Sequence, residues 1–303
     1  AYGQTGSGKT YTIYGEDRYT RGVVFRAVED LFNLLAAAQS ADNVRFSVRC
    51  SMVELYVDQF RDLLAESAPA PTAASKGSLK LEVKQSPVFG TIVQNAIMKH
   101  ASSAEEILGM MDRGTRLRQV HATQVNPQSS RSHTVFTLYL DVRHLREQTV
   151  TKSKLTFVDL AGSERISKSG STGVRLKEAQ HINKSLSALG DVVAALSCGD
   201  PHTPYRNSKL TTMLQDTLGG NSKTLMFLNI FPSGFNTSES MSTLQFGSRV
   251  KQVRNPFVRN KASVDPGRGS GSGSLGSSSR PREISDESSA QSQAGTSGQQ
   301  WRR

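Results

Sequence analysis

The chain has 303 residues, 36% of them hydrophobic, which is enough to build one large domain or two small ones. Its 37 basic and 26 acidic residues leave a formal net charge of +11, which favours an acidic partner such as nucleic acid, an anionic membrane or an acidic protein surface. The two cysteines lack metal-ligand spacing and indicate a reducing compartment. No apolar run in these residues approaches membrane-spanning length, and no signal peptide is visible.

The first motif along the chain is a phosphate-binding loop of the form GxxxxGK[ST]. Its glycines open backbone conformations that are closed to residues with a Cβ, so that successive N–H groups can cradle the α and β phosphates. The ammonium group of Lys9 would meet the β and γ phosphates, and the hydroxyl group of Thr10 can ligate Mg²⁺. Kinases, GTPases, helicases and motors all use such a loop, so it predicts nucleotide binding without specifying a function. The predicted nucleotide-binding residues are Gly3, Gln4, Thr5, Gly6, Ser7, Gly8, Lys9 and Thr10.

Strand and helix patterns alternate along the rest of the chain. Residues 223–231 (KTLMFLNIF) are apolar throughout and predict a strand buried on both faces. Alternating strands and helices indicate an α/β fold with a central, mostly parallel or mixed sheet and helices on both faces. The predicted helices are 23–38, 176–196, 208–218 and 240–253, and the other predicted strands are 44–52, 133–142 and 153–160.

The composition changes after about Val264, where glycine and serine dominate and large apolar residues are nearly absent. Such a segment cannot bury enough surface to offset the entropy of ordering. We therefore expect a folded domain over residues 1–260 and a disordered tail over 261–303, with no heptad repeat after the domain.

Two further motifs, NPQSSRSH at 126–133 and DLAGSE at 159–164, follow the phosphate-binding loop. The three together resemble the nucleotide triad of kinesin motor domains, which consists of the P-loop, switch I (NxxSSRSH) and switch II (DxxGxE). Residues 204–211, 214–224 and 243–255 are also similar to later kinesin segments. The resemblance covers residues 1 to about 260 and implies a P-loop NTPase fold of the kinesin motor type.

The switch residues have a chemical rationale of their own. Asp159 ends a predicted strand, where its carboxylate can reach the Mg²⁺ shell through water, although a helix N-cap is an alternative role. Gly162 leaves an N–H free to sense a γ phosphate. The hydroxyl groups of Ser129 and Ser130 can contact phosphate and Mg²⁺, although a solvated turn would use the same residues. Taken alone, His133 is structural rather than catalytic.

The kinesin resemblance assigns roles to two charged switch residues. It implies that Arg131 and Glu164 form a salt bridge that closes the switches over ATP, and that Glu164 then relays a proton from the attacking water. The alternative is an ordinary surface ion pair, worth less than about 1 kcal/mol. The segment that contacts adenine in the family lies before its P-loop strand and is absent here, so no base-binding residue is assigned.

The same resemblance identifies the acidic partner as tubulin, with no membrane or nucleic-acid partner expected. The alternative for any single lysine or arginine is a solvated surface. The location implied is the microtubule cytoskeleton of the cytoplasm, with the spindle as one site. The predicted microtubule-binding residues are Arg165, Lys168, Lys184, Arg206 and Lys209.

These observations predict a microtubule-stimulated ATPase that uses ATP and Mg²⁺. One alternative is a kinesin-like module that binds microtubules without cycling, and a more distant one is a P-loop NTPase acting on nucleic acid. A motor followed only by a disordered tail resembles the minus-end-directed kinesins, whose motor lies at the C-terminus.

The motifs are complete from the P-loop onward, whereas the strands that precede it in the kinesin fold are missing from this sequence. We therefore expect residues 1–303 alone to be a partial motor domain that aggregates and binds ATP poorly, because an unpaired sheet edge invites association. Dimerisation would need an upstream stalk.

Overall fold

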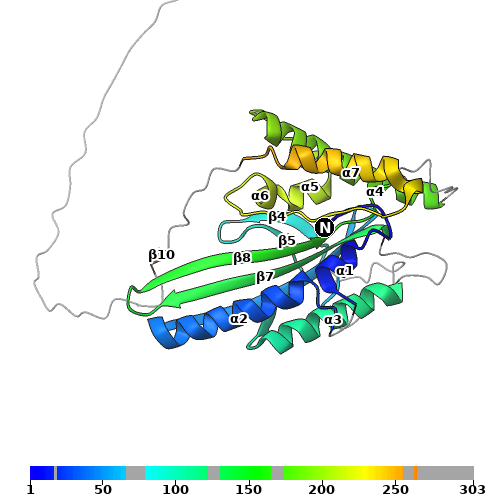
Figure 1. Cartoon of the computed structure of the whole chain (residues 1–303). Helices are drawn as coiled ribbons and strands as arrows, with labels where there is room; N and C mark the ends of the chain where they lie inside the picture. The colour runs from blue at the N-terminus through cyan, green and yellow to red at the C-terminus, as the bar shows by residue number, and fades with distance from the viewer. Residues whose placement is uncertain (17–18, 66–78, 122–129, 165–173, 255–262, 265–303) are drawn as a thin grey trace, which may run out of the picture. The chain divides into compact units, whose positions relative to one another are not determined.

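The computed structural model of the chain describes residues 1–16, 19–65, 79–121, 130–164, 174–254 and 263–264, all within one unit, Ala1–Asp265 (Figure 1). Ten strands and nine helical segments are described in these ranges. In chain order they are β1 (Tyr2–Gly3), α1 (Lys9–Tyr14), α2 (Val23–Asp42), β2 (Val44–Tyr56), β3 (Gln59–Asp62), β4 (Glu82–Ser86), β5 (Gly90–Gln94), β6 (Lys99–Ala101), α3 (Ala104–His121), β7 (Ser132–His144), β8 (Thr149–Asp159), α4 (Val174–Cys198), η3 (Tyr205–Asn207), α5 (Lys209–Met213), α6 (Gln215–Leu218), β9 (Leu228–Asn229), η4 (Gly234–Asn236), α7 (Thr237–Val250) and β10 (Ser263–Val264).

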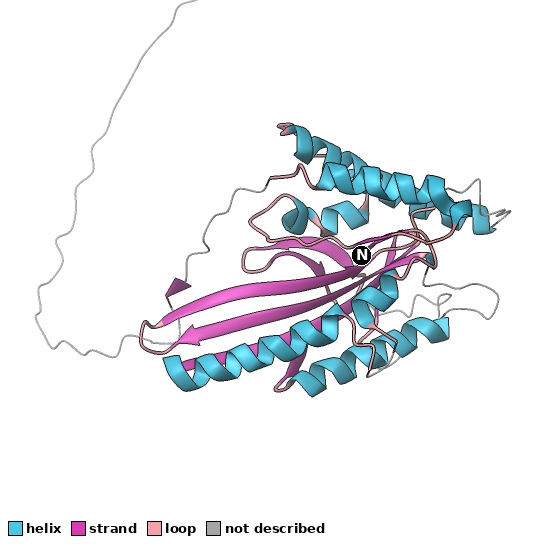
Figure 2. Cartoon of the chain, viewed as in Figure 1, coloured by secondary structure: helices cyan, strands magenta, loops and turns pink. Residues whose placement is uncertain are grey.

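A six-stranded sheet forms the centre of the unit, with β8, β7 and β2 as neighbouring long strands (Figure 2). β7 pairs antiparallel with β2 from Ser132 to His144 and with β8 from Thr134 to His144. Only four residues join β7 to β8, and such a short connection can link only antiparallel strands. Among the described pairs only β1 and β9 are parallel and the others are antiparallel, so of the two expected arrangements the strands follow the mixed one.

Helices cover both faces of the sheet, as predicted (Figure 1). On one face α1, α2 and α3 pack against β2, β7 and β8 through buried residues such as Val28, Ile107 and Phe136. On the other face α4, α5, α6 and α7 enclose a second core that includes Leu189 and Leu210. Neighbouring strand residues point to opposite faces, and for this reason two separate cores share one sheet.

The predicted helices and most predicted strands are confirmed. Val24 and Val28 are fully buried on the inner face of α2, and α4 contains the whole predicted helix 176–196. The predicted helix 208–218 is divided at Leu214 into α5 and α6. A capping box formed by the side chains of Ser208 and Thr211 defines the start of α5.

The segment 223–231 is the main error among the predicted elements. Only Leu228 and Asn229 form a strand, β9, and the side chains of Leu225 and Ile230 are 78% and 48% exposed. Among the described strands β9 pairs only with the two-residue strand β1, so no ladder extends along the rest of the segment. A hollow of about 780 Å³ lies between β8 and residues 221–227.

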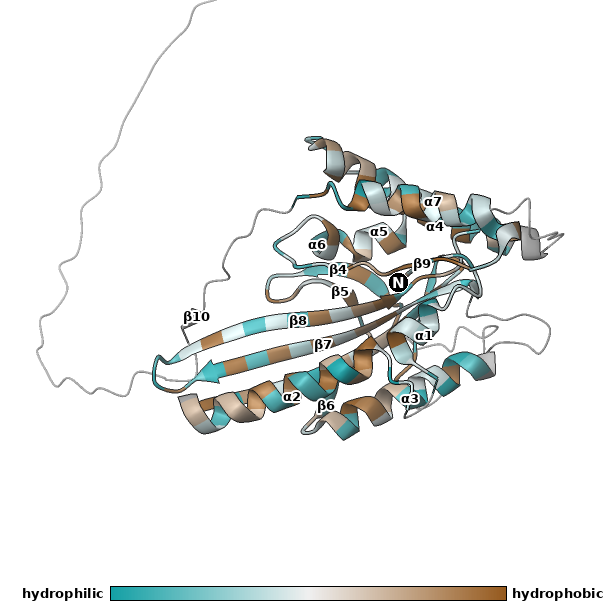
Figure 3. Cartoon of the chain, viewed as in Figure 1, coloured by the Kyte–Doolittle hydropathy of each residue, from teal (hydrophilic) through white to brown (hydrophobic). Residues whose placement is uncertain are grey.

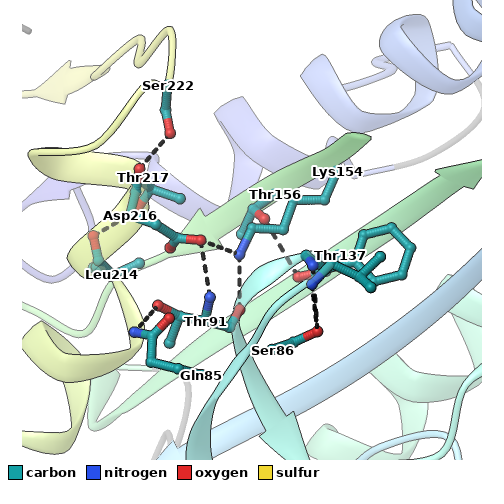
Figure 4. A network of polar contacts seen from close by, with 12 residues as sticks. Gln85, Ser86, Thr91, Thr137, Lys154, Thr156, Leu214, Asp216, Thr217 and Ser222 are labelled. Atoms are coloured by element: carbon teal, nitrogen blue, oxygen red, sulfur yellow. Dashed lines mark hydrogen bonds and ion pairs between the residues drawn. The ribbon is translucent and has the colours of Figure 1, made fainter. Parts of the chain in front are cut away.

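A polar network anchors the small β4–β5 hairpin to the unit (Figure 4). The Lys154 ammonium group of β8 lies 2.6 Å from a carboxylate oxygen of Asp216 in α6 and donates to the Thr91 carbonyl oxygen at 2.7 Å. The Thr91 backbone N–H in turn donates to Asp216 at 3.0 Å. One half-buried ion pair therefore joins a sheet strand, a helix and the hairpin.

Hydropathy changes along the two longest hairpin strands (Figure 3). Hydrophilic residues gather toward the turn that joins β7 to β8, whereas the opposite half of β7 is continuously buried from Ser132 to Leu140. None of the helices in the described residues is long and apolar enough to cross a membrane. Cys50 is buried, Cys198 is exposed, and both thiols are free.

Candidate functional site

The phosphate-binding loop starts where β1 lies between β8 and β9. The Ala1 amino group donates to the Val158 carbonyl oxygen at 2.8 Å, and Leu160 N–H donates to the Ala1 carbonyl oxygen at 3.4 Å. On the other side Tyr2 and Gly3 pair with Leu228 and Asn229. These bonds place the loop at the carboxyl edge of the sheet, directly beside the end of β8, which carries Asp159.

Two glycines give the loop its shape. Gly6 and Gly8 have φ angles of 78° and 90°, a region that residues with a Cβ rarely adopt, and α1 begins immediately afterwards at Lys9. The Lys9 side chain is buried, and its ammonium group donates to the Gln4 carbonyl oxygen at 2.9 Å. Burial lowers the pKa of Lys9, while the nearby carboxylates of Asp159 and Glu164 oppose that shift. The Lys9 cation is therefore held inside the loop that it is predicted to serve.

Thr10 and Asp159, two predicted magnesium ligands, lie together. The Thr10 hydroxyl group donates to Oδ2 of Asp159 at 2.8 Å, and the aspartate is fully buried. Its second oxygen, Oδ1, has no hydrogen-bond partner among the described residues. A buried carboxylate oxygen without a partner, next to a hydroxyl group, suits a hard cation such as Mg²⁺. No group of three or more His, Cys, Asp and Glu side chains in the described ranges could hold a metal, so such an ion would need phosphate and water ligands.

Arg118 of α3 is a member of the site that the sequence reasoning missed. The guanidinium group is buried, donates to Oδ2 of Asp159 at 3.2 Å and to the Ser132 carbonyl oxygen at 3.1 Å, and lies 3.7 Å from the buried carboxylate of Glu54. Arg118 continues the spacing of Ile107, Met111 and Gly114 on the inner face of α3. An arginine on the apolar stripe of a helix was the signal that could have identified it.

Backbone hydrogen bonds tie the switch II segment to both switch I and the P-loop. The Gly162 N–H donates to the Ser130 carbonyl oxygen at 2.8 Å, and the Ser163 N–H donates to the Gly3 carbonyl oxygen at 3.0 Å. The Gly162 N–H, predicted to sense a γ phosphate, is therefore occupied by switch I in this conformation. Ser129, a predicted catalytic residue, lies outside the described residues.

The expected salt bridge between Arg131 and Glu164 is not formed in this conformation. Arg131 instead donates to the Glu178 carboxylate of α4 at 2.7 Å, and the Tyr56 hydroxyl group donates to the other oxygen of Glu178 at 2.6 Å. Glu164 accepts from the Thr5 N–H at 2.8 Å and from the Thr5 hydroxyl group at 2.5 Å. Arg131 therefore pairs with the carboxylate that α4 places beside it, and Glu164 is bonded to the P-loop residue Thr5.

His133 lies at the start of β7 and is buried between switch II and α4. Its Nδ1 accepts a hydrogen bond from the Ala161 N–H at 3.1 Å, and its Nε2 lies 2.9 Å from the Ser185 hydroxyl group. Burial, together with the positive charges of Arg118 and Lys9, lowers the pKa of His133 to about 3. The imidazole is therefore neutral at physiological pH.

Three predicted microtubule-binding residues line one hollow of about 230 Å³, which we call the basic hollow. Lys184 and Arg206 are exposed there, and the half-buried Lys209 donates to the Asp58 carbonyl oxygen at 2.5 Å. Arg131 and His133 line the inner side of the same hollow. The other two predicted contacts, Arg165 and Lys168, lie outside the described residues.

Comparisons with known proteins agree with this geometry. A sequence model of the kinesin motor domain matches residues 1–253 of the chain. The chain is 47% identical over 255 residues to the kinesin-like protein KIN-14E of Arabidopsis thaliana, and 46% identical over 253 residues to KIN-14R of the same species. Both matches cover 84% of this chain, but only 19% and 22% of the two relatives, so the chain spans about a fifth of their length.

Two solved structures resemble the chain over most of its length. One is a fast kinesin, described for its ATPase mechanism and its interactions with microtubules. It is 41% identical with a TM-score of 0.76, and the match covers 88% of this chain and 73% of that one. The other is a dimer of KIF14 with AMP-PNP in complex with a microtubule. It is 36% identical with a TM-score of 0.76, and the match covers 87% of this chain and 72% of that one.

Proposed function

Because the chain belongs to the kinesin motor-domain family, whose members are ATPases, we propose that it hydrolyses ATP and uses the energy to move or exert force along microtubules. The observation that carries this proposal is the meeting of P-loop and switch II, where Thr10 bonds to Asp159 and Gly3 accepts from Ser163. A site that links phosphate cradle and switch in this way can respond to the state of a bound nucleotide.

Several residues would hold ATP and Mg²⁺ in this proposal. The backbone from Gly3 to Gly8 would cradle the phosphates, Lys9 would neutralise their charge, and Thr10 and Ser130 would ligate the metal. Asp159, with its unpartnered Oδ1, would orient a water of the metal shell. When bound, Mg²⁺ supplies charge neutralisation at the β and γ phosphates.

Hydrolysis would use the switch residues in a rearranged state. We assign Gly162 to the γ phosphate, Ser129 to contact with that phosphate, and Glu164 to accepting a proton from the attacking water, with Arg131 as its ion-pair partner. In the present conformation Gly162 is bonded to Ser130, and Arg131 to Glu178. Both bonds would have to open before the closed site can form.

Microtubule binding is assigned to the basic hollow and to two residues that follow switch II. Lys184, Arg206 and Lys209 present cations around one concave surface, which supports contact with the acidic surface of tubulin. Arg165 and Lys168 complete the proposed set. We place the motor domain at residues 1–260 and a tail at 261–303, and we expect the protein on cytoplasmic microtubules, the spindle included. We assign it to the minus-end-directed, C-terminal-motor group, to which we also assign the relatives named KIN-14.

Steady-state ATP turnover measured with microtubules, with DNA and with neither tests the proposal. We expect turnover to rise several-fold or more with microtubules and to be insensitive to DNA. Microtubule binding without turnover would point to a module that does not cycle. Stimulation by DNA alone would point to an NTPase that acts on nucleic acid, and either result would overturn the proposal.

A further inference from the structure

A continuous chain of hydrogen bonds runs from switch II to α4 through His133. The Ala161 N–H donates to Nδ1 of His133 at 3.1 Å, and Nε2 on the other side of the ring lies 2.9 Å from the Ser185 hydroxyl group. The Ser185 hydroxyl group donates to the Ile182 carbonyl oxygen at 2.7 Å, one turn earlier in α4. Two segments far apart in the sequence are thus joined through one side chain.

The direction of every bond in this chain follows from the chemistry of a neutral imidazole. Nδ1 accepts from a backbone N–H, so the single ring proton lies on Nε2. Nε2 therefore donates to the Ser185 oxygen, whose own proton is directed to Ile182. The imidazole is only 3% exposed, so water does not compete for either nitrogen. Each ring nitrogen of His133 therefore has one hydrogen-bond partner within the protein.

The switch II end of the chain lies beside the residue assigned to the γ phosphate. Ala161 directly precedes Gly162, whose N–H donates to the Ser130 carbonyl oxygen at 2.8 Å. If the Gly162 N–H turns from Ser130 toward a phosphate, the Ala161–Gly162 peptide must shift as well. His133 is bonded to that segment and would be displaced with it.

The other end of the chain lies beside a proposed microtubule contact. Ser185 follows Lys184, and both line the basic hollow. We propose that His133 is a positioning residue that couples the γ-phosphate state of switch II to the position of α4. This inference rests on the proposed function, and it specifies the route by which nucleotide and microtubule affect each other.

The variant Ser185→Ala removes the α4 end of the chain and leaves a good helix former in place. Loss of one hydrogen bond between neutral groups costs about 1 kcal/mol, so we expect microtubule-stimulated turnover to fall roughly five- to tenfold. Ser185→Thr keeps the hydroxyl group and should restore the stimulation. Full stimulation in Ser185→Ala would overturn the inference.

α4 offers a matched control at Ser197. Its hydroxyl group donates to the Ala194 carbonyl oxygen at 2.8 Å, which repeats the local bond of Ser185, and no imidazole of the described residues is hydrogen-bonded to it. Ser197→Ala should therefore keep the stimulation within about twofold of the parent protein. An equal loss in Ser197→Ala and Ser185→Ala would show that helix stability, and not the route through His133, is responsible.

A double-mutant cycle tests whether His133 and Ser185 act together. In His133→Asn the amide oxygen can replace Nδ1 as acceptor for Ala161, but the shorter side chain cannot reach Ser185. We expect the double variant to be no more impaired than His133→Asn alone, because both changes break the same chain. Additive losses would contradict the proposal.

A measurement without microtubules separates this inference from the proposed function. Hydrogen exchange of the α4 backbone amides is compared between the ADP state and a non-hydrolysable ATP analogue. We expect a nucleotide-dependent difference in the parent protein and Ser197→Ala, and its loss in Ser185→Ala. An unchanged difference in Ser185→Ala, or none in the parent protein, would overturn the coupling. Absence of microtubule stimulation would instead overturn the proposed function.

Discussion

The cations of the nucleotide site and those of the basic hollow are the same residue types in opposite surroundings. Lys9 and Arg118 are 6% and 5% exposed, and each donates to a specific oxygen of the protein. Lys184 and Arg206 are exposed on the outer side of the unit. A buried cation is costly without a partner, whereas an exposed one is screened by salt over about 8 Å. Substitutions in the first region should therefore have large effects that depend little on salt.

Glu164→Ala should have the largest effect, on turnover rather than on binding. A positioned proton acceptor contributes about 10²- to 10⁴-fold to a rate, so ATP should still bind while hydrolysis falls by that factor. The variant should remain attached to microtubules in ATP, which co-sedimentation measures. Normal turnover would show that Glu164 does not accept the proton. This substitution in the nucleotide site would then not have a larger effect than those in the basic hollow.

Lys9→Ala should reduce ADP affinity by roughly 100-fold while the fold is retained. A hydrogen bond to a charged group contributes about 1.5–3 kcal/mol, and the variant removes the ammonium group that is buried within the phosphate-binding loop. Calorimetric titration with ADP measures the affinity, and far-UV circular dichroism checks the fold. An unchanged affinity would mean that the loop does not hold the phosphates.

Arg206→Glu combined with Lys209→Glu should weaken microtubule affinity by roughly tenfold at low salt. The remaining affinity should depend less on salt than that of the parent protein, because exposed charge contacts are screened. Co-sedimentation over a series of salt concentrations gives both quantities, and ATP turnover without microtubules reports whether the nucleotide site is intact. If low-salt affinity is unaffected, the microtubule-binding surface lies elsewhere.

Residues 223–231 expose apolar side chains to solvent, whereas Lys184 and Arg206 of the basic hollow expose charged ones. Leu225 and Ile230 are 78% and 48% exposed beside a two-residue strand, so this apolar surface should cause the chain to self-associate. Replacing both residues with lysine should shift the chain toward monomer in sedimentation velocity. A monomeric parent chain in the same measurement would contradict this expectation.

The smallest expected effect is a pH dependence of stability from His133. Its pKa is lowered from 6.5 to about 3 in the folded protein, so the unfolded state binds more protons as the pH falls below 6.5. The free energy of unfolding should decrease in that range, by at most about 1.4 kcal/mol per pH unit from this group. Denaturant unfolding between pH 5 and 7 should show a shallower slope for His133→Asn. Equal slopes would mean that folding does not lower the pKa of His133.

Local patterns in the sequence determined the elements whose signal lies within a few residues. The helical spacing of Val24 and Val28 predicted α2, and the alternation from Val44 to Met52 predicted β2. The P-loop, Asp159 and Gly162 were identified in the same way, because each stands in a short motif with a chemical reason for its spacing. The prediction of a buried strand over residues 223–231 was wrong, because an apolar run is buried only where neighbouring strands cover it.

Only the tertiary structure decided which polar groups meet. Thr10 and Asp159 are 149 positions apart, and Arg131 and Glu178 are 47 apart, so no local pattern reports either pair. Burial makes such pairing compulsory, since a charge removed from water must find a partner, and the packing of α3 and α4 determined which one was within reach. The sequence by itself identified the family and its phosphate chemistry, because both are carried by short local motifs. The fold alone revealed Arg118 at Asp159, Glu178 at Arg131, and the path through His133 that joins switch II to α4.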